Sequence, residues 1–408
     1  MTNVTAPASN DVYAIPQQSL ASIFLRFLRF GALAWGGPVA QIAMLRQSLV
    51  EEERWVSAAH FNRALALYQV LPGPEAHELC VYFGMLARGR LGGILAGLGF
   101  MLPGFALMLG LSWAYFEIGL DVHGALAPLL AAVQAAVIAL IVRAVQRLGS
   151  HILLDRWLWS IGALACIAQL LGVHFAYILI GGGIAYVLAM RSAAVATALL
   201  TAFALCLSVI WLQTPIAGSL QAAQDSKTAL ASVSLATLFW AGLKAGMLSF
   251  GGAYTAIPLL QGDAVSSGAW MTDAQFMDGI ALSGLLPAPL IIFGTFVGYL
   301  GGGLLGALVV TAAIFLPAFA LTLIAHDPLE RLIHEPRIRS FLDGLTAAVV
   351  GLIAATAVSL AVIAIDGLLT ALIFVAASAA LFYWNSRWLI PVVIAAAAVI
   401  GTLALYVP

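Results

Sequence analysis

Long apolar segments alternate with short polar ones along nearly the whole chain, and this pattern predicts a succession of membrane-spanning helices. A helix needs about 20 apolar residues to cross the hydrocarbon core. In the first half such segments run over 19–47, 57–87, 91–116, 124–147, 153–171, 173–190 and 193–213. In the second half they run over 234–260, 274–300, 303–324, 338–364, 367–384 and 387–406. A Pro-x-Pro motif interrupts both 57–87 and 274–300, so each either crosses as two half-helices or dips in and returns.

The two sets of segments are copies of one another. The Trp-Gly-Gly of 35–37 returns as the Phe-Gly-Gly of 250–252, and the Pro-Gly-Pro of 72–74 returns as the Pro-Ala-Pro of 287–289, both at an offset of 215. A duplication that retains Gly and Pro inside apolar segments is typical of transporters with broken helices. Such breaks are tolerated in a membrane only where protein or a watery cavity satisfies the freed backbone groups.

Composition agrees with a membrane protein. Hydrophobic residues make up 63% of the chain, charged residues 9%, and the mean hydropathy is +1.05. The net charge of -1 and the lack of a basic tract argue against nucleic-acid binding. Together with the duplication, these features predict a disordered N-terminal lead (1–18), a first transmembrane repeat (19–213), a polar linker (214–233) and a second repeat (234–408).

The positions of the arginines indicate how many times the chain crosses the membrane. If both Pro-x-Pro segments cross, the chain has thirteen spans and most of its arginines fall on one side. They are Arg88, Arg90, Arg143, Arg147, Arg156, Arg191, Arg331, Arg337, Arg339 and Arg387. Because the basic side is cytoplasmic, the N-terminus is predicted inside and the C-terminus outside. Seven crossings before the second copy is an odd number, so the two repeats are predicted to have inverted topology.

Two cations occupy matched positions deep in their segments. Arg29 lies seven residues before Gly36, and Lys244 lies seven before Gly251. A charge at mid-depth is costly and therefore indicates function. In an inverted pair of repeats, both cations would face one cavity and would suit a doubly charged anion. The alternative is a side chain that snorkels to the membrane surface.

The glycine and proline motifs predict the remainder of an anion site. A half-helix that restarts after a Gly-Gly break presents free N–H groups and the positive end of its dipole to an anion. The alternative is that the motifs only kink helices or allow tight packing. The predicted binding residues are Arg29, Lys244, Gly36, Gly37, Pro38, Gly251, Gly252, Pro72, Gly73, Pro74, Pro287 and Pro289.

Glu75, His77 and Glu78 follow the first Pro-Gly-Pro directly, and the second copy has no equivalent of them. Ionisable groups in a desolvated cavity can carry protons, so these three residues are candidates for proton coupling. The alternative is the first turn of a half-helix, where the helix dipole favours Glu without any function.

These residues resemble the chromate ion transporter family in its long two-domain form. The similarity lies in the Gly-Gly-Pro of 36–38 followed by Gln41, in Trp55 and Phe61, and in the Leu-Pro-Gly-Pro of 71–74. It adds Gln41 to the predicted binding residues. It implies thirteen spans, antiparallel halves, and chromate efflux from the bacterial cytoplasm across the inner membrane, giving chromate resistance. Sulfate is implied as a similar, competing ion. The chain departs from the motif at Ala288.

Membrane voltage favours export of such an ion, since an anion leaving a negative interior moves down the electrical gradient. Proton antiport would add to this drive. Two other functions remain open at this point. One is a carrier of sulfate or another oxyanion. The other is a membrane enzyme acting on a lipid phosphate, although two acidic ligands are few for metal-assisted chemistry. No metal or cofactor is predicted.

Overall fold

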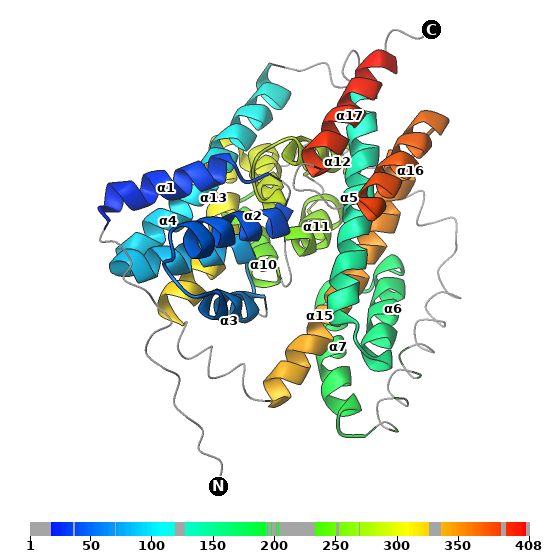
Figure 1. The fold of residues 1–408 in the computed structure, drawn as a ribbon. Helices are drawn as coiled ribbons and strands as arrows, with labels where there is room; N and C mark the ends of the chain where they lie inside the picture. The colour runs from blue at the N-terminus through cyan, green and yellow to red at the C-terminus, as the bar shows by residue number, and fades with distance from the viewer. Residues whose placement is uncertain are drawn as a thin grey trace.

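The computed structural model describes most of the chain as a set of helices (Figure 1). The described residues are 18–35, 37–69, 71–118, 127–192, 194, 197, 201, 203, 233–249, 253–268, 270–325, 336–384 and 389–404. Nearly all of the predicted N-terminal lead and of the polar linker lies outside them, and so does most of the span 193–213. Gly36, Gly251 and Gly252 also lie outside them.

Every regular element in the described part is helical, as the apolar pattern predicts. The first half contains α1 (Leu20–Ala32), α2 (Gly37–Arg46), the π-helix η1 (Gln47–Glu52), α3 (Ala58–Tyr68), α4 (Glu75–Glu117), α5 (Ala127–Ile152), α6 (Arg156–Leu170) and α7 (Phe175–Ala189). The second half contains α10 (Leu235–Met247), η2 (Ala253–Thr255), α11 (Ala256–Gln261), the π-helix η3 (Gly262–Ser267), α12 (Asp273–Gly284), η4 (Leu290–Ile292), α13 (Phe293–Ile324), α15 (Pro336–Ala364), α16 (Leu368–Tyr383) and α17 (Leu389–Leu403).

Four helical stretches in the described residues are long and apolar enough to cross a membrane: Glu75–Glu117, Ala127–Ile152, Leu290–Ile324 and Ile338–Ala364. Shorter apolar helices are α7, α16 and α17. The protein is therefore an all-α membrane protein. The count of thirteen crossings stays a prediction.

Helix starts are matched between the two halves. Ser19 caps α1 and Ser234 caps α10, each with its side chain accepting a hydrogen bond from a backbone N–H in the first turn. Ser57 caps α3 and Thr272 caps α12 in the same way. Ser and Thr are favoured at this position because the hydroxyl satisfies a backbone donor that the helix leaves unpaired. Both pairs are separated by the offset of 215 seen in the sequence.

Helix α4 is a hairpin of two antiparallel arms. Its backbone leaves helical geometry at Arg88 and Gly89, where Gly89 has a φ of +64°. The arms then pack so closely that a Cβ on Gly84 would lie 2.5 Å from the carbonyl oxygen of Gly92. Only glycine permits this approach. Helix α13 turns in the same way at Gly302 and Gly303. In each half, the chain therefore reverses direction between two consecutive spans that the sequence predicts as separate.

The helices form two groups, which lie side by side in Figure 1. One contains α1–α4 with α10, α11 and α13, the other contains α5–α7 with α15–α17, and α12 contacts both. Within the first group, α1 packs on α4 and α10 packs on α13. A Cβ on Gly31 would lie 2.2 Å from the carbonyl oxygen of Phe100, and one on Gly246 would lie 2.2 Å from that of Ile314. The same close packing therefore occurs once in each half.

Helices of each half also pack on helices of the other half. In the second group, α5 packs on α16 and α17, whereas α15 packs on α6 and α7. In the first group, α4 packs on α13, with Gly93 against Leu323 and Gly97 against Phe319. Because the partner number falls as the α4 number rises, these two arms run antiparallel.

Candidate functional site

The first helix break lies between α1 and α2. Helix α1 ends at Ala32, and α2 begins at Gly37, which has a φ of +76°. Gln41 is buried, and its side-chain Nε2 donates a 3.0 Å hydrogen bond to the carbonyl oxygen of Ala34. The predicted binding residue Gln41 thus satisfies a carbonyl that the break releases from the helix. Pro38, the second residue of α2, is half-buried.

This break faces the corresponding break of the second half. A Cβ on Gly37 would lie 3.9 Å from the hydroxyl oxygen of Tyr254 and 3.9 Å from Ile390 on α17. Tyr254 belongs to η2, which begins directly after Gly252. The described flanks of the two breaks are therefore neighbours, and a shared anion site at the breaks stays a prediction.

The first Pro-x-Pro loop joins the same junction. The backbone N–H of Gly73 donates a 2.9 Å hydrogen bond to the carbonyl oxygen of Ser249, just before the second break. Gly73 has a φ of +149°, and a Cβ there would lie 2.7 Å from a carboxylate oxygen of Glu78. Pro72 is half-buried, and the buried Pro74 is the N-cap of α4. We call the region formed by Gly37 with Tyr254 and by Gly73 with Ser249 the central junction.

The second Pro-x-Pro loop packs on a helix of the first half. Pro287 is half-buried and Pro289 is the buried N-cap of η4. The side chain of Ala288 packs on Gly104 of α4, and Gly73 packs on Ala318 of α13 in the equivalent contact. Each Pro-x-Pro loop therefore packs on the long hairpin arm of the opposite half.

The three proton-coupling candidates begin α4 at the central junction. Glu75 is 8% exposed, and His77 and Glu78 are fully buried. The His77 ring lies 4.8 Å from the ring centres of Phe315 and Phe319, which belong to the second half. Neither carboxylate oxygen of Glu78 hydrogen-bonds to another described residue. A buried carboxyl group without such a partner is rare and costly, which favours a functional role over a simple helix start.

Tyr254, whose hydroxyl oxygen lies beside the Gly37 break, is a junction residue that the sequence does not single out. Arg147 lies on α5 in the second helix group and is exposed. The sequence counts Arg147 only among the charges that mark the cytoplasmic side.

Arg29 and Lys244 occupy matched places one turn before the ends of α1 and α10. The backbone N–H of Leu33 donates to the carbonyl oxygen of Arg29, and that of Leu248 donates to Lys244. Arg29 is exposed. Lys244 Nζ forms a 2.6 Å ion pair with Asp263. A helix C-terminus favours a cation in any case. The paired-cation site therefore stays a prediction, with one of its two charges balanced by Asp263.

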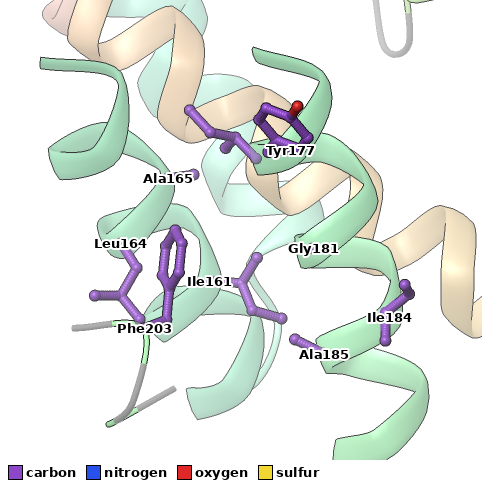
Figure 2. A pocket seen from close by; sticks show the side chains of 10 residues that line it. Ile161, Leu164, Ala165, Tyr177, Gly181, Ile184, Ala185 and Phe203 are labelled. Carbon is purple, nitrogen blue, oxygen red and sulfur yellow. The ribbon is translucent and has the colours of Figure 1, made fainter. Parts of the chain in front are cut away.

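The pocket drawn in Figure 2 lies away from these residues, between α6 and α7, with a volume of about 220 Å³. Its walls are apolar, with Ile161, Leu164, Ile184 and Phe203 around it and the side chain of Tyr177 at one side. It includes none of the predicted site residues and no charged side chain. Such walls offer nothing to bind an oxyanion.

Metal-ligand geometry is also absent from the described part of the chain. No three His, Cys, Asp or Glu side chains in it are grouped closely enough to hold a metal ion.

Comparison with known proteins gives a consistent result. The family model described as "Chromate transporter" matches residues 21–188 and again residues 236–402. A chromate transport protein of Pseudomonas aeruginosa is 53% identical over 95% of this chain and 93% of its own length. One of Cupriavidus metallidurans is 32% identical over 97% and 96%, and a probable one of Synechococcus elongatus is 31% identical over 95% and 96%. No solved structure matches this chain.

Proposed function

Because the chain belongs to the chromate transporter family, we propose that it exports chromate from the bacterial cytoplasm across the inner membrane and so confers chromate resistance. Relatives in three organisms carry names that refer to chromate transport, and each aligns over nearly the full length of this chain. The substrate on this proposal is a tetrahedral dianion.

The observation that carries the proposal is the central junction. Helix breaks from both halves meet there, at Gly37 and Tyr254, and the Pro-Gly-Pro loop bonds to the second break through Gly73. Backbone that leaves helical geometry inside a membrane protein marks a substrate site, because only a cavity or protein can satisfy it. The proposed binding residues are those predicted from the sequence, including the undescribed Gly36, Gly251 and Gly252.

We propose that the two repeats are inverted, with the N-terminus in the cytoplasm and the C-terminus outside. Two contacts support this arrangement. The equivalent arms of α4 and α13 pack antiparallel, and the Pro-x-Pro loops make the same contact in exchange, Gly73 with Ala318 and Ala288 with Gly104. Reciprocal contacts are the sign of a two-fold relation. If both arms cross the membrane, that two-fold axis lies in the membrane plane.

In this proposal, the membrane voltage drives chromate export. Each elementary charge that moves outward gains about 2.3 kcal/mol per 100 mV, and a dianion gains about twice that. Glu75, His77 and Glu78 are proposed to couple proton movement to anion movement, because ionisable groups buried at the junction can change charge only as the cavity changes.

The proposal is tested by flux measurements in vesicles reconstituted with the full chain. Chromate-loaded vesicles with a negative interior should lose chromate faster than protein-free vesicles, and collapsing the voltage should slow the loss. Sulfate and phosphate form the comparison arms. If sulfate moves and chromate does not, the chain is a sulfate carrier. If no oxyanion moves under any voltage or pH gradient, the proposed function is wrong.

A further inference from the structure

We propose that Glu78 is a proton-operated latch on the first Pro-Gly-Pro loop. In its protonated form the carboxyl group holds the Gly73 turn against the second helix break, and its ionisation releases that turn. This inference rests on the proposed function, because it assigns the proposed proton coupling to one residue and one contact that opens and closes.

The carboxyl group of Glu78 lies directly against the Gly73 turn. A Cβ on Gly73 would lie 2.7 Å from Oε1 of Glu78 and 2.8 Å from its carboxyl carbon. Glycine is the residue that leaves this space open. The carboxyl group therefore fills the place that a side chain at position 73 would take.

The Gly73 turn also contacts the second half of the chain. Its N–H donates a 2.9 Å hydrogen bond to the carbonyl oxygen of Ser249, and a Cβ on it would lie 3.2 Å from the Cβ of Ala318 on α13. Ser249 is buried and directly precedes the second break. A displacement of the Glu78 carboxyl group therefore reaches a contact that joins the two halves.

Glu78 has no partner that would balance a negative charge. It is fully buried, and neither of its carboxyl oxygens hydrogen-bonds to another described residue. Burying an isolated charge costs far more than burying an unpaired neutral group. The packed position therefore suits the protonated form, and an ionised Glu78 would have to leave it for a hydrated place.

The elements packed against α4 carry several ionisable groups. They are Arg26 and Arg29 on α1, Arg46 on α2, His60 and Arg63 on α3, and Asp273 and Asp278 on α12, with Glu75 and His77 beside Glu78 on α4 itself. Helices α13 and η4 carry no charged side chain. Arg26 pairs with Glu53, and His60 bonds to Tyr82. None of these groups in the described part of the chain hydrogen-bonds to Glu78.

The second half lacks this arrangement. At the offset of 215, the positions equivalent to Gly73 and Glu78 are Ala288 and Phe293. The buried ring of Phe293 packs edge-on against Phe276, with centroids 5.5 Å apart. The glycine and the ionisable group thus occur together in the first loop and are replaced together in the second. A proton can therefore act on one of the two loops only.

Release of the Gly73 turn would open the central junction. The Gly73 N–H and the Ser249 carbonyl group satisfy each other across the two halves. If they separate, each needs a new partner, and at membrane depth a water-filled cavity supplies one. Ionisation of Glu78 and entry of water at the second break therefore favour each other. Transport needs the closed and the open state in turn, so a residue 78 that cannot ionise should slow the cycle.

The test follows access to position 249 in the full chain, reconstituted in vesicles. The three native cysteines are replaced by alanine, and Ser249→Cys provides one thiol of similar size. Its rate of reaction with a small thiol reagent is divided by the rate in the unfolded chain at the same pH, which removes the pH dependence of the thiol itself. This access ratio should rise by about tenfold from acidic to alkaline pH, within the range typical of coupled sites.

Glu78→Gln retains the shape of the neutral carboxyl group and cannot ionise. In this variant the access ratio should stay low at every pH, and chromate flux should fall and lose its pH dependence. The matched control is Glu117→Gln, the same change at the exposed far end of α4. Its access ratio should rise with pH as in the unchanged protein.

Thermal unfolding in detergent shows whether each variant folds. If Glu78→Gln does not fold, Glu78→Asp still tests the inference. Its shorter side chain withdraws the carboxyl group from Gly73, so the access ratio should be raised even at acidic pH. A ratio equal to that of the unchanged protein would contradict the latch.

An access ratio that rises with pH in folded Glu78→Gln as it does in the unchanged protein would overturn the inference. So would a ratio in the unchanged protein that does not vary with pH. Because this measurement needs no substrate, either result leaves the proposed function intact as long as the unchanged protein moves chromate under voltage. Failure of that protein to move any oxyanion would instead remove the proposed function itself.

Discussion

The hydroxyl group of Tyr115 donates a 2.7 Å hydrogen bond to Oδ2 of Asp278, a buried carboxylate from the opposite half of the chain. Gln134 Nε2 donates a second 2.7 Å bond to Oδ1. The three residues lie on α4, α12 and α5, so this cluster joins both halves and both helix groups. A buried carboxylate held by two donors is a strong local constraint, because each of its oxygens is desolvated and satisfied.

Asp278→Ala should therefore destabilise the protein by about 2 kcal/mol or more, because Tyr115 and Gln134 would keep buried donors without acceptors. The measurement is the midpoint of thermal unfolding in detergent. Asp278→Asn should cost less, since it retains one acceptor. Asp366→Ala is the control, because Asp366 is exposed near the start of α16 and should change the midpoint little. Equal midpoints for Asp278→Ala and Asp366→Ala would contradict the constraint.

Gly73→Ala should impair both folding and transport. Its φ of +149° disfavours any residue with a Cβ, and that Cβ would meet a carboxylate oxygen of Glu78 at 2.7 Å. Strain in such a conformation costs on the order of 1–3 kcal/mol. Ala288→Gly makes the reverse change at the equivalent loop, where the methyl group already packs on Gly104. The transport rate and the midpoint of thermal unfolding should both fall further in Gly73→Ala than in Ala288→Gly. Equal losses in the two variants would show that the two loops are interchangeable.

Arg29→Ala and Lys244→Ala test the predicted pair of cations. If both charges bind the anion, each variant should fold and yet lose chromate flux in vesicles. Lys244→Ala should in addition lower the unfolding midpoint, because it leaves the partly buried Asp263 without its ion pair. Normal flux in both folded variants would reject the pair and leave these residues as stabilisers of helix ends.

Reporter fusions test the topology. A reporter that works only outside the cytoplasm should be active when it is fused to the C-terminus, because thirteen crossings place the two termini on opposite sides. A reporter at the N-terminus should be active inside. With the N-terminus inside, an inside C-terminus would require an even number of crossings and would rule out the count of thirteen.

The sequence by itself determines the membrane class, the duplication and the places where helices break. Apolar length decides which segments can enter a bilayer, and Gly and Pro limit local backbone geometry, so both can be inferred without a fold. This is why the interruption before Gly37 and the separation near Arg88 appear in the structure where the pattern predicts them. Capping by Ser57 and Thr272 is likewise a local preference.

Only the tertiary structure decided which charges meet. Tyr115 and Asp278 are 163 positions apart, and Gln134 and Asp278 are 144 apart. The rotation of each helix and the exchange of contacts between halves bring these pairs together. Neither can be read from the sequence, since partner and burial depend on how whole helices pack. The same packing places Lys244 beside Asp263. A cation's function therefore depends on its neighbours in space, which the position of its residue along an apolar segment does not specify.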